Sequence, residues 1–420
     1  MHQPSSIRRR GWLAIALAGF VGLVGAARAE EPVGVHDPIH GYNSLPTHDR
    51  FAGFKADLDA GRVALDAGDE RSLLRSLLQA LDVPVSSQMI VTSATSFQKT
   101  IISPQRPRAL YFNNDTYVGY VPGGQIEVIS VDPTRGPMFY IFNRLQAGKV
   151  PRSRRSENCL SCHGTPEMGE VPQLVIESVV PGLSGGGERA FRRGKSGHGV
   201  PLDQRFGGWL VTDAPGFTRH QGNILIEWTE GRAEERAIRP GELFDTGRYL
   251  VPTSGLLPQL LHEHQVGFIN RAVSATYRAR TLLHRNGGDE AAVAPDLDAL
   301  ARDLVRYILF ADEAPLPPGG VTGSDDFRAD FLARRRTASD GRSLRDLDLK
   351  TRLLSHRCSY MIESAAFTGL PRPLRQAVDR ELSRALHPVV AAPDYAYLPD
   401  DEKAAIRVIL GETRPPLAAD

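Results

Sequence analysis

The chain has 420 residues, a formal net charge of +1 and 41% hydrophobic residues. This near-neutral balance gives no reason to expect nucleic acid or an anionic membrane as a partner. The length is sufficient for two or three domains with buried cores, and only three residues are Cys.

Residues 1–29 have the pattern of a secretory signal peptide. Three Arg at 8–10 form a basic start, residues 12–25 are an apolar run too short to span a bilayer comfortably, and Ala-Arg-Ala at 27–29 is a small-x-small cleavage site. We therefore expect export to the periplasm, a mature chain that begins at Glu30 and no integral membrane segment after cleavage. An uncleaved membrane anchor is the alternative. Cleavage removes four Arg and no acid, which changes the formal charge from +1 to −3.

The next part of the chain divides into two kinds of pattern. Residues 30–87 are expected to be irregular at first and then helical, with leucines on one face of a helix at 70–81. Residues 88–250 contain short β runs separated by turns, which predicts an antiparallel sheet region. The expected strands are 89–91, 109–112, 117–121, 126–131, 138–142, 208–211 and 223–228.

Within this β region, residues 146–200 are rich in Gly and weakly periodic, so we expect a loop with short helical turns and a strand within 171–180. The loop contains Cys159-Leu160-Ser161-Cys162-His163, the Cys-x-x-Cys-His pattern to which c-type haem is attached. Two thiols on one turn add to the two porphyrin vinyl groups, and the adjoining imidazole becomes the proximal iron ligand. The motif therefore predicts one covalent haem c, held by Cys159 and Cys162 with His163 as the proximal ligand.

Two other uses of paired cysteines fit less well. A structural zinc site normally needs four Cys or His ligands, typically from a second paired motif that the sequence lacks. A thioredoxin-like pair opens a helix after a strand, which the Arg- and Gly-rich flanks do not suggest. Haem attachment uses two of the three Cys and leaves Cys358 alone, so no internal disulfide is expected. Cys358 lies on a predicted core stripe and is expected to be a small buried side chain.

After Pro252 the pattern is helical, and residues 251–415 are predicted to form a helical domain. The expected helices are 257–284, 296–310, one beginning at Ser343 with inward residues to 365, 373–386 and 400–410. The predicted fold class is α+β: an antiparallel sheet region carrying a haem-binding loop, followed by an all-helical C-terminal region.

The ligand on the second face of the iron decides the chemistry, and several residues are candidates. Met168 lies five residues past His163, so about 18 Å of chain would have to round the porphyrin edge. His198, in a flexible Ser-Gly-His-Gly turn, and His220, just before a predicted strand, are the better candidates. His264 occupies the apolar stripe of the long helix and needs a hydrogen bond or a metal there. The helix also carries two histidines that are expected to face solvent, His262 and His284.

Several short segments together resemble a family of secreted bacterial mono-haem cytochrome-c-like proteins. Besides the haem motif they are 109–113, 117–121, 205–209 (Arg-Phe-Gly-Gly-Trp), 219–223 (Arg-His-Gln-Gly-Asn), 263–265, 310–314 and 348–353. The resemblance runs from about Arg106 to the last helices and names no substrate. It implies that Cys159, Cys162 and His163 hold haem and that His198, His220 and His264 match His positions of the family. Met168 matches no Met of the family, and residues 191–195 depart from its acidic version.

The sequence thus predicts a periplasmic mono-haem c-type cytochrome that exchanges electrons with a redox partner protein. His163 is the expected proximal ligand, with His198 or His220 as the distal one. One alternative is a haem peroxidase or oxidase with an open distal site, in which His220 or His264 acts as acid or base. The other is a haem-containing binding or sensing protein whose helical region meets a partner.

Overall fold

The computed structural model describes residues 34–146, 148–192, 195–214, 217, 219–389 and 392–414. The predicted signal peptide lies outside these residues. Among the residues described, no helix combines the length and the apolar character needed to cross a membrane.

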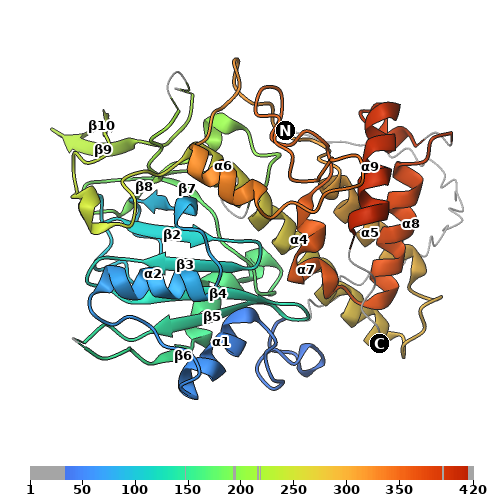
Figure 1. Ribbon diagram of the computed structural model, residues 1–420, viewed down its shortest axis with the longest axis horizontal. Helices are drawn as coiled ribbons and strands as arrows, with labels where there is room; N and C mark the ends of the chain where they lie inside the picture. The colour runs from blue at the N-terminus through green and yellow to red at the C-terminus, as the bar shows by residue number, and fades with distance from the viewer. Residues whose placement is uncertain are drawn as a thin grey trace, which may run out of the picture. The chain divides into compact units, whose positions relative to one another are not determined.

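The central element is a six-stranded antiparallel sheet in which each strand pairs with its neighbours in sequence (Figure 1). The strands alternate with turns, as the sequence pattern predicts, and β5 pairs with β4 in the register Ile129↔Phe139 and Val128↔Tyr140. The strands are β1 (Met89–Val91), β2 (Arg108–Phe112), β3 (Thr116–Tyr120), β4 (Ile126–Asp132), β5 (Gly136–Phe142) and β6 (Ser153–Arg155).

Two helices, α1 (Arg50–Asp59) and α2 (Glu70–Ala80), cover one face of this sheet (Figure 1). Each begins at an Asp whose side chain accepts a hydrogen bond from a backbone N–H of the first turn: Asp49 from Ala52 and Asp69 from Ser72. The α2 leucines are buried, as expected. The irregular structure expected around residue 50 was wrong, because Asp49 caps a helix whose Phe51 packs on the sheet.

Two small hairpins follow the sheet. The first joins β7 (Ser178–Pro181) to β8 (Gly187–Arg192), and the second joins β9 (Ile224–Thr229) to β10 (Arg232–Ala237). Residues 208–211 do not form the expected strand. Phe206 and Gly208 both have positive φ, which breaks the extended run and leaves one bridge, between Trp209 and Val91.

The C-terminal half is helical, so the predicted α+β class is confirmed. The long α4 (Leu256–Arg285) is buried along most of its length, and one continuous hydrophobic core joins it to the sheet. The other helices of this half are α5 (Ala294–Ile308), α6 (Asp325–Leu332), α7 (Ala365–Thr368), α8 (Arg372–Ala385) and α9 (Asp400–Thr413).

The helix expected to begin at Ser343 was wrong. Its first part is a series of turns in which Asp346 accepts from the backbone N–H of Ser343 and Asp348 accepts from that of Thr351. Leu349 has φ 62°, a left-handed conformation that a helix cannot contain. Short polar side chains that bond to nearby backbone groups favour turns over helix, and here they outweigh the apolar spacing.

Candidate haem-attachment site

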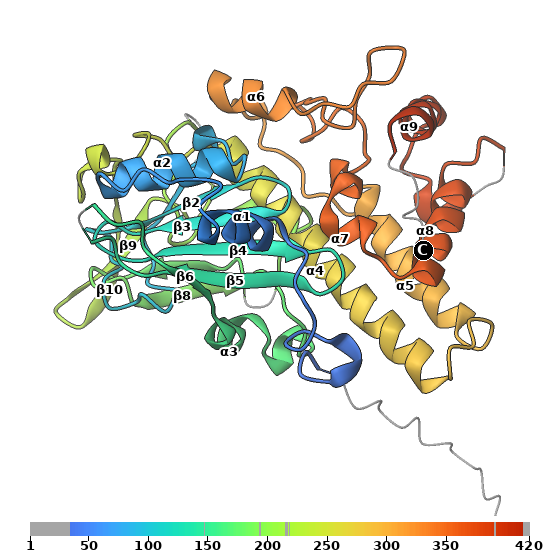
Figure 2. The same cartoon turned by 60° about the horizontal axis from the view of Figure 1, so that its bottom comes forward.

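The haem motif lies on the face of the sheet opposite α1. Side chains of a strand alternate between faces, and Phe51 of α1 packs on Tyr140 and Phe142 of β5. Phe139 directly precedes Tyr140 in β5 and therefore points to the other face, where its ring lies 4.7 Å from that of His163. Figure 2 shows α3 (Leu160–His163) on this side, away from α1 and α2.

The two thiols of the motif are free and lie in two short helical turns that follow each other directly. A 3-10 turn, Glu157–Cys159, leads directly into α3, and the thiols are three positions apart. Residues at this spacing share a helix face. Cys159 is partly buried and Cys162 is exposed, so a group approaching from solvent meets both. By contrast Cys358 is wholly buried in the core.

His163 is held in the form that binds a metal through Nε2. Its Nδ1 lies 2.8 Å from the backbone oxygen of Gln173. A carbonyl oxygen can only accept, so Nδ1 carries the proton and donates it. Burial lowers the pKa of His163 to about 4, so the ring is neutral near pH 7. The lone pair is then on Nε2, the usual state of a metal-ligating imidazole whose other nitrogen is fixed by a carbonyl.

Helix α4 holds residues 173–174 in place, and the backbone oxygen of Gln173 accepts the hydrogen bond from His163. Gln173 donates from Nε2 to the Met168 backbone oxygen and to Ser274 Oγ of α4, each at 3.0 Å. One turn earlier on the helix, the Asn270 side chain forms two hydrogen bonds of 2.8 Å with the backbone of Leu174. The His163 ring therefore bonds to a backbone segment that two side chains of a buried helix hold in place.

His198 lies in a buried pair with His264. Their Nδ1 atoms are 2.8 Å apart, and His264 Nε2 lies 2.7 Å from Ser359 Oγ. The ring of His198 stacks on those of Tyr307 at 4.1 Å and Phe310 at 4.5 Å. The partner that a buried His264 requires is thus a hydrogen bond. Burial lowers the pKa of both rings, that of His264 to about 3, so both are neutral at pH 7.

In the described structure no hydrogen bond or ring contact joins His198 to His163. Gln173, which fixes His163, contacts Ser274, whereas His198 contacts His264. Ser274 and His264 are ten residues apart in α4, or about 15 Å along its axis. Two axial nitrogens of one iron are only about 4 Å apart, twice a metal–nitrogen bond of about 2 Å.

His220 is held in a local turn. Its Nδ1 accepts a hydrogen bond of 2.9 Å from the backbone N–H of Gly222, and its ring packs near Phe217 and Phe206. A neutral ring whose Nδ1 accepts carries its proton on Nε2, so here Nε2 is a donor and not a ligand. Burial lowers the pKa of His220, which favours this neutral ring.

The expectation that His262 faces solvent was wrong. It is 5% exposed and lies among the rings of Phe112, Tyr117 and Trp209. Since α4 is enclosed on nearly all sides, being off its apolar stripe does not place a residue in water. Among the described residues, no group of three or more His, Cys, Asp or Glu side chains is arranged to hold a metal ion.

Comparison with known proteins returns no relative: no family of proteins, no curated protein and no solved structure matches the chain. The chain is therefore described as an α+β protein with a Cys-x-x-Cys-His motif in which the imidazole Nδ1 bonds to a backbone carbonyl.

Proposed function

We propose that the protein is an exported mono-haem c-type cytochrome that transfers electrons. The observation that carries the proposal is the hydrogen bond from His163 Nδ1 to the Gln173 carbonyl, which leaves Nε2 for iron beside two free thiols. Each thiol would add across one vinyl group, the sulfur going to one carbon and the hydrogen to the other. The bound haem would supply an iron that cycles between Fe(III) and Fe(II).

The attachment is tested by haem staining after denaturing electrophoresis. We expect the full-length protein, produced with periplasmic cytochrome c maturation, to keep its stain. The Cys159→Ser, Cys162→Ser double variant loses it completely, because no thioether can form. Cys358→Ser is the matched control and keeps the stain, since Cys358 is buried away from the motif. Staining of the double variant, or an unstained wild-type protein, contradicts covalent haem.

A second candidate function, a haem enzyme with an open sixth position, is favoured by the contacts of His198 and His220. Each has its Nδ1 in a hydrogen bond with another group: His264 for His198 and the backbone N–H of Gly222 for His220. The spectrum of the ferric protein separates the two functions. A high-spin iron that binds cyanide rapidly supports the enzyme, whereas a low-spin iron in both oxidation states supports electron transfer.

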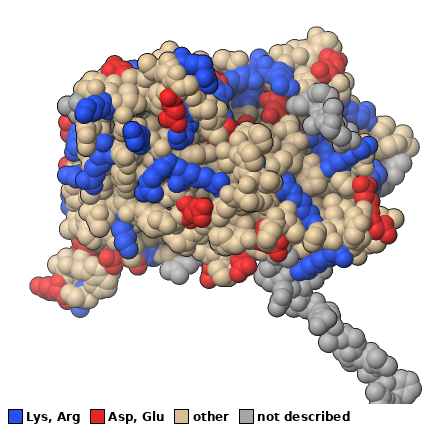
Figure 3. Space-filling view, turned by 90° about the horizontal axis from the view of Figure 1, so that it is seen from below, with Lys and Arg blue, Asp and Glu red and all other residues tan. Residues whose placement is uncertain are grey.

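The redox partner is proposed to be an acidic protein that docks on the basic hairpin, residues 143–155, which joins β5 to the haem motif. Its Arg144, Lys149, Arg152 and Arg154 are exposed. Within the described chain, none of the four is in an ion pair with a carboxylate. Figure 3 looks onto the β6 edge of the sheet, where Lys and Arg side chains gather. Unpaired cations beside a redox centre attract an oppositely charged partner.

The charge of this hairpin is tested with ferricyanide, an anion that takes one electron from the ferrous protein. Arg152→Gln together with Arg154→Gln should slow this oxidation severalfold at low ionic strength. At about 0.5 M salt, where the charges are screened, the variants should react as fast as the wild type. The control removes two exposed arginines elsewhere, Arg328→Gln and Arg380→Gln. Equal slowing in the control contradicts a role for the hairpin.

A further inference from the structure

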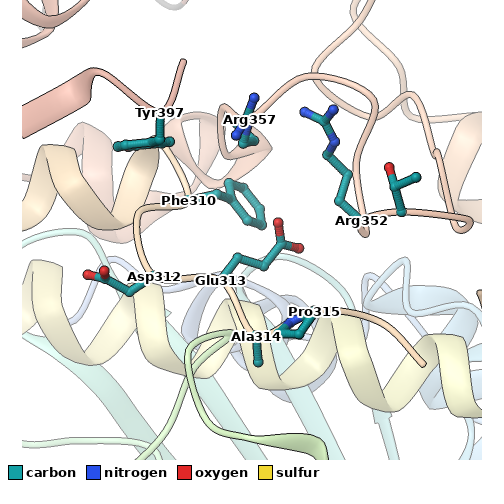
Figure 4. Close-up of a pocket in the computed structure, with 9 residues that line it drawn as sticks. Phe310, Asp312, Glu313, Ala314, Pro315, Arg352, Arg357 and Tyr397 are labelled. Carbon is teal, nitrogen blue, oxygen red and sulfur yellow. The ribbon is translucent and has the colours of Figure 1, made fainter. Parts of the chain in front are cut away.

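Two loops of the helical half face each other across an open cavity of about 480 Å³ (Figure 4). One loop follows α5 and contributes Phe310, Asp312 and Glu313. The other precedes the 3-10 turn Tyr360–Glu363 and contributes Arg352 and Arg357. A cavity of this volume is within the range of small-molecule sites. The haem proposal uses neither loop.

Both loops are held in conformations that non-glycine residues seldom adopt. Phe310 has φ 56°, Asp312 has φ 62°, and Leu349 in the facing loop has φ 62°. Such conformations persist only where the surrounding structure holds them, and they concentrate at binding sites. Here the α5 loop is fixed by an ion pair of 2.7 Å from Arg306 to Asp312 and by the Phe310 ring, which stacks on His264.

The loop that carries the arginines presents fixed guanidinium donors. Glu402 of α9 accepts from Nη1 of Arg352 at 3.1 Å and from Nη2 of Arg357 at 2.6 Å. One carboxylate thus orients both arginines, which are only 29% and 20% exposed. Each keeps one terminal nitrogen outside these contacts, Nη2 of Arg352 and Nη1 of Arg357. Oriented guanidinium groups of this kind recognise carboxylates.

The facing loop presents a carboxylate. Glu313 accepts one hydrogen bond of 3.3 Å, from the backbone N–H of Leu353, and forms no ion pair with Arg352 or Arg357. In Figure 4 its carboxylate points from the α5 loop into the space below the two arginines. A simple anion in the cavity would meet Glu313, and a simple cation would meet the arginines. A ligand that carries both charges can pair its anionic group with the arginines and its cationic group with Glu313.

We propose that this cavity binds a small zwitterion of the amino-acid class, a free amino acid or a dipeptide. The ligand's carboxylate lies on Arg352 and Arg357, and its ammonium group lies on Glu313. The edge of the buried Phe310 and the half-buried ring of Tyr397 complete the lining and offer an apolar side chain a contact surface. This site is independent of the haem motif, so it stands whether or not haem is attached.

The test is binding to the full-length exported protein, measured by thermal shift and then by calorimetry. The probes are the standard amino acids and alanyl dipeptides at 10 mM, each compared with its N-acetylated form, which lacks the cation, and its amide, which lacks the anion. We expect at least one zwitterion to raise the melting temperature, and both of its modified forms to bind at least tenfold more weakly. The proposal is overturned if no zwitterion binds, or if the N-acetylated form binds equally well.

Substitutions of the lining residues test whether the zwitterion binds in this cavity. Glu313→Gln, which keeps the shape of the side chain, should weaken the zwitterion at least tenfold. Arg352→Lys should do the same, because a single ammonium cannot replace the planar guanidinium. Arg380→Gln, at an exposed pair on α8, is the control and should bind as the wild type does. If Arg352→Lys does not fold, the Glu313→Gln result decides alone: unchanged affinity in a folded Glu313→Gln protein overturns the proposal.

Discussion

His163 and His198 are both held by contacts that lead to α4, but their Nδ1 atoms have different partners. His163 is partly exposed and donates from Nδ1 to a backbone carbonyl that α4 holds through Ser274. His198 is 4% exposed and bonds through Nδ1 to His264, a residue of α4 itself. Both rings are neutral near pH 7, because burial lowers both pKa values. The difference lies in the partner of Nδ1: a carbonyl fixes the tautomer of His163, whereas a second imidazole leaves that of His198 open.

This difference has a chemical consequence. With a carbonyl as its partner, Nε2 of His163 always carries the lone pair and always qualifies as a ligand. Nε2 of His198 carries a proton or a lone pair, depending on how the protons are placed along the chain from Ser359 through His264. That atom is buried and has no hydrogen-bond partner within the described part of the chain. His163 is therefore the better candidate to bind the proposed haem, whereas His198 belongs to the interior of the protein.

Removing each ring in turn tests whether His163 and His198 have these different roles. His163→Ala should keep haem through its thioethers but lose the proximal ligand, so that the visible spectrum changes completely and added imidazole restores it. His198→Ala should leave the spectrum of the folded protein unchanged. A low-spin iron that becomes high-spin in His198→Ala would identify His198 as the distal ligand and would sink the assignment to the interior.

The second prediction concerns stability. His264→Ala removes a ring that is 0% exposed, leaves His198 Nδ1 without its partner and takes from Ser359 Oγ one of its two partners. A cavity and unsatisfied polar groups together should lower the free energy of unfolding by about 3–5 kcal/mol. Denaturant titration followed by circular dichroism measures it. His284→Ala, at the exposed end of the same helix, is the control and should change stability by less than about 0.5 kcal/mol.

The elements of the fold were largely predictable, whereas the contacts that prepare the site were not. Alternating β runs and leucines at helical spacing gave β2 to β5 and α2 because those signals are local. The pairing of His198 with His264 joins residues 66 positions apart, and Asn270 reaches Leu174 across 96. No periodicity encodes such contacts. The Cys-x-x-Cys-His motif was readable because its chemistry requires adjacent residues, but Gln173, which sets the His163 tautomer, carries no local signal.

The third prediction uses pH. In the folded state the pKa of His264 is lowered to about 3, against about 6.5 in the unfolded chain. As the pH falls below about 6.5 the unfolded chain takes up a proton that the folded chain does not, so this residue makes the protein less stable. Its share is about 1.4 kcal/mol per pH unit. His264→Gln should therefore reduce the dependence of stability on pH by that amount between about pH 5.5 and 4.

The check is a series of denaturant titrations across this pH range, with His284→Gln as the control on the same helix. We expect the control to follow the wild-type slope, because His284 is exposed. A His264→Gln slope equal to that of the wild type would mean that His264 is protonated in the folded protein, and the neutral pair with His198 would have to be abandoned.

The smallest change in the haem spectrum is expected where the two regions meet, at Asn270. Asn270→Ala removes two hydrogen bonds of 2.8 Å to the backbone of Leu174 and should cost about 1–3 kcal/mol. The variant also tests whether α4 acts on His163, because Leu174 is next to Gln173, whose backbone oxygen accepts from His163. If α4 positions the His163 ring, the variant should also release the ring from its fixed orientation, and the axial-ligand features of the ferric EPR spectrum should broaden. Ser274→Ala, which removes the single hydrogen bond to Gln173, should produce the same broadening with a smaller loss of stability. Loss of stability without any spectral change in either variant would show that the two histidines share a helix but that α4 does not control the ligand.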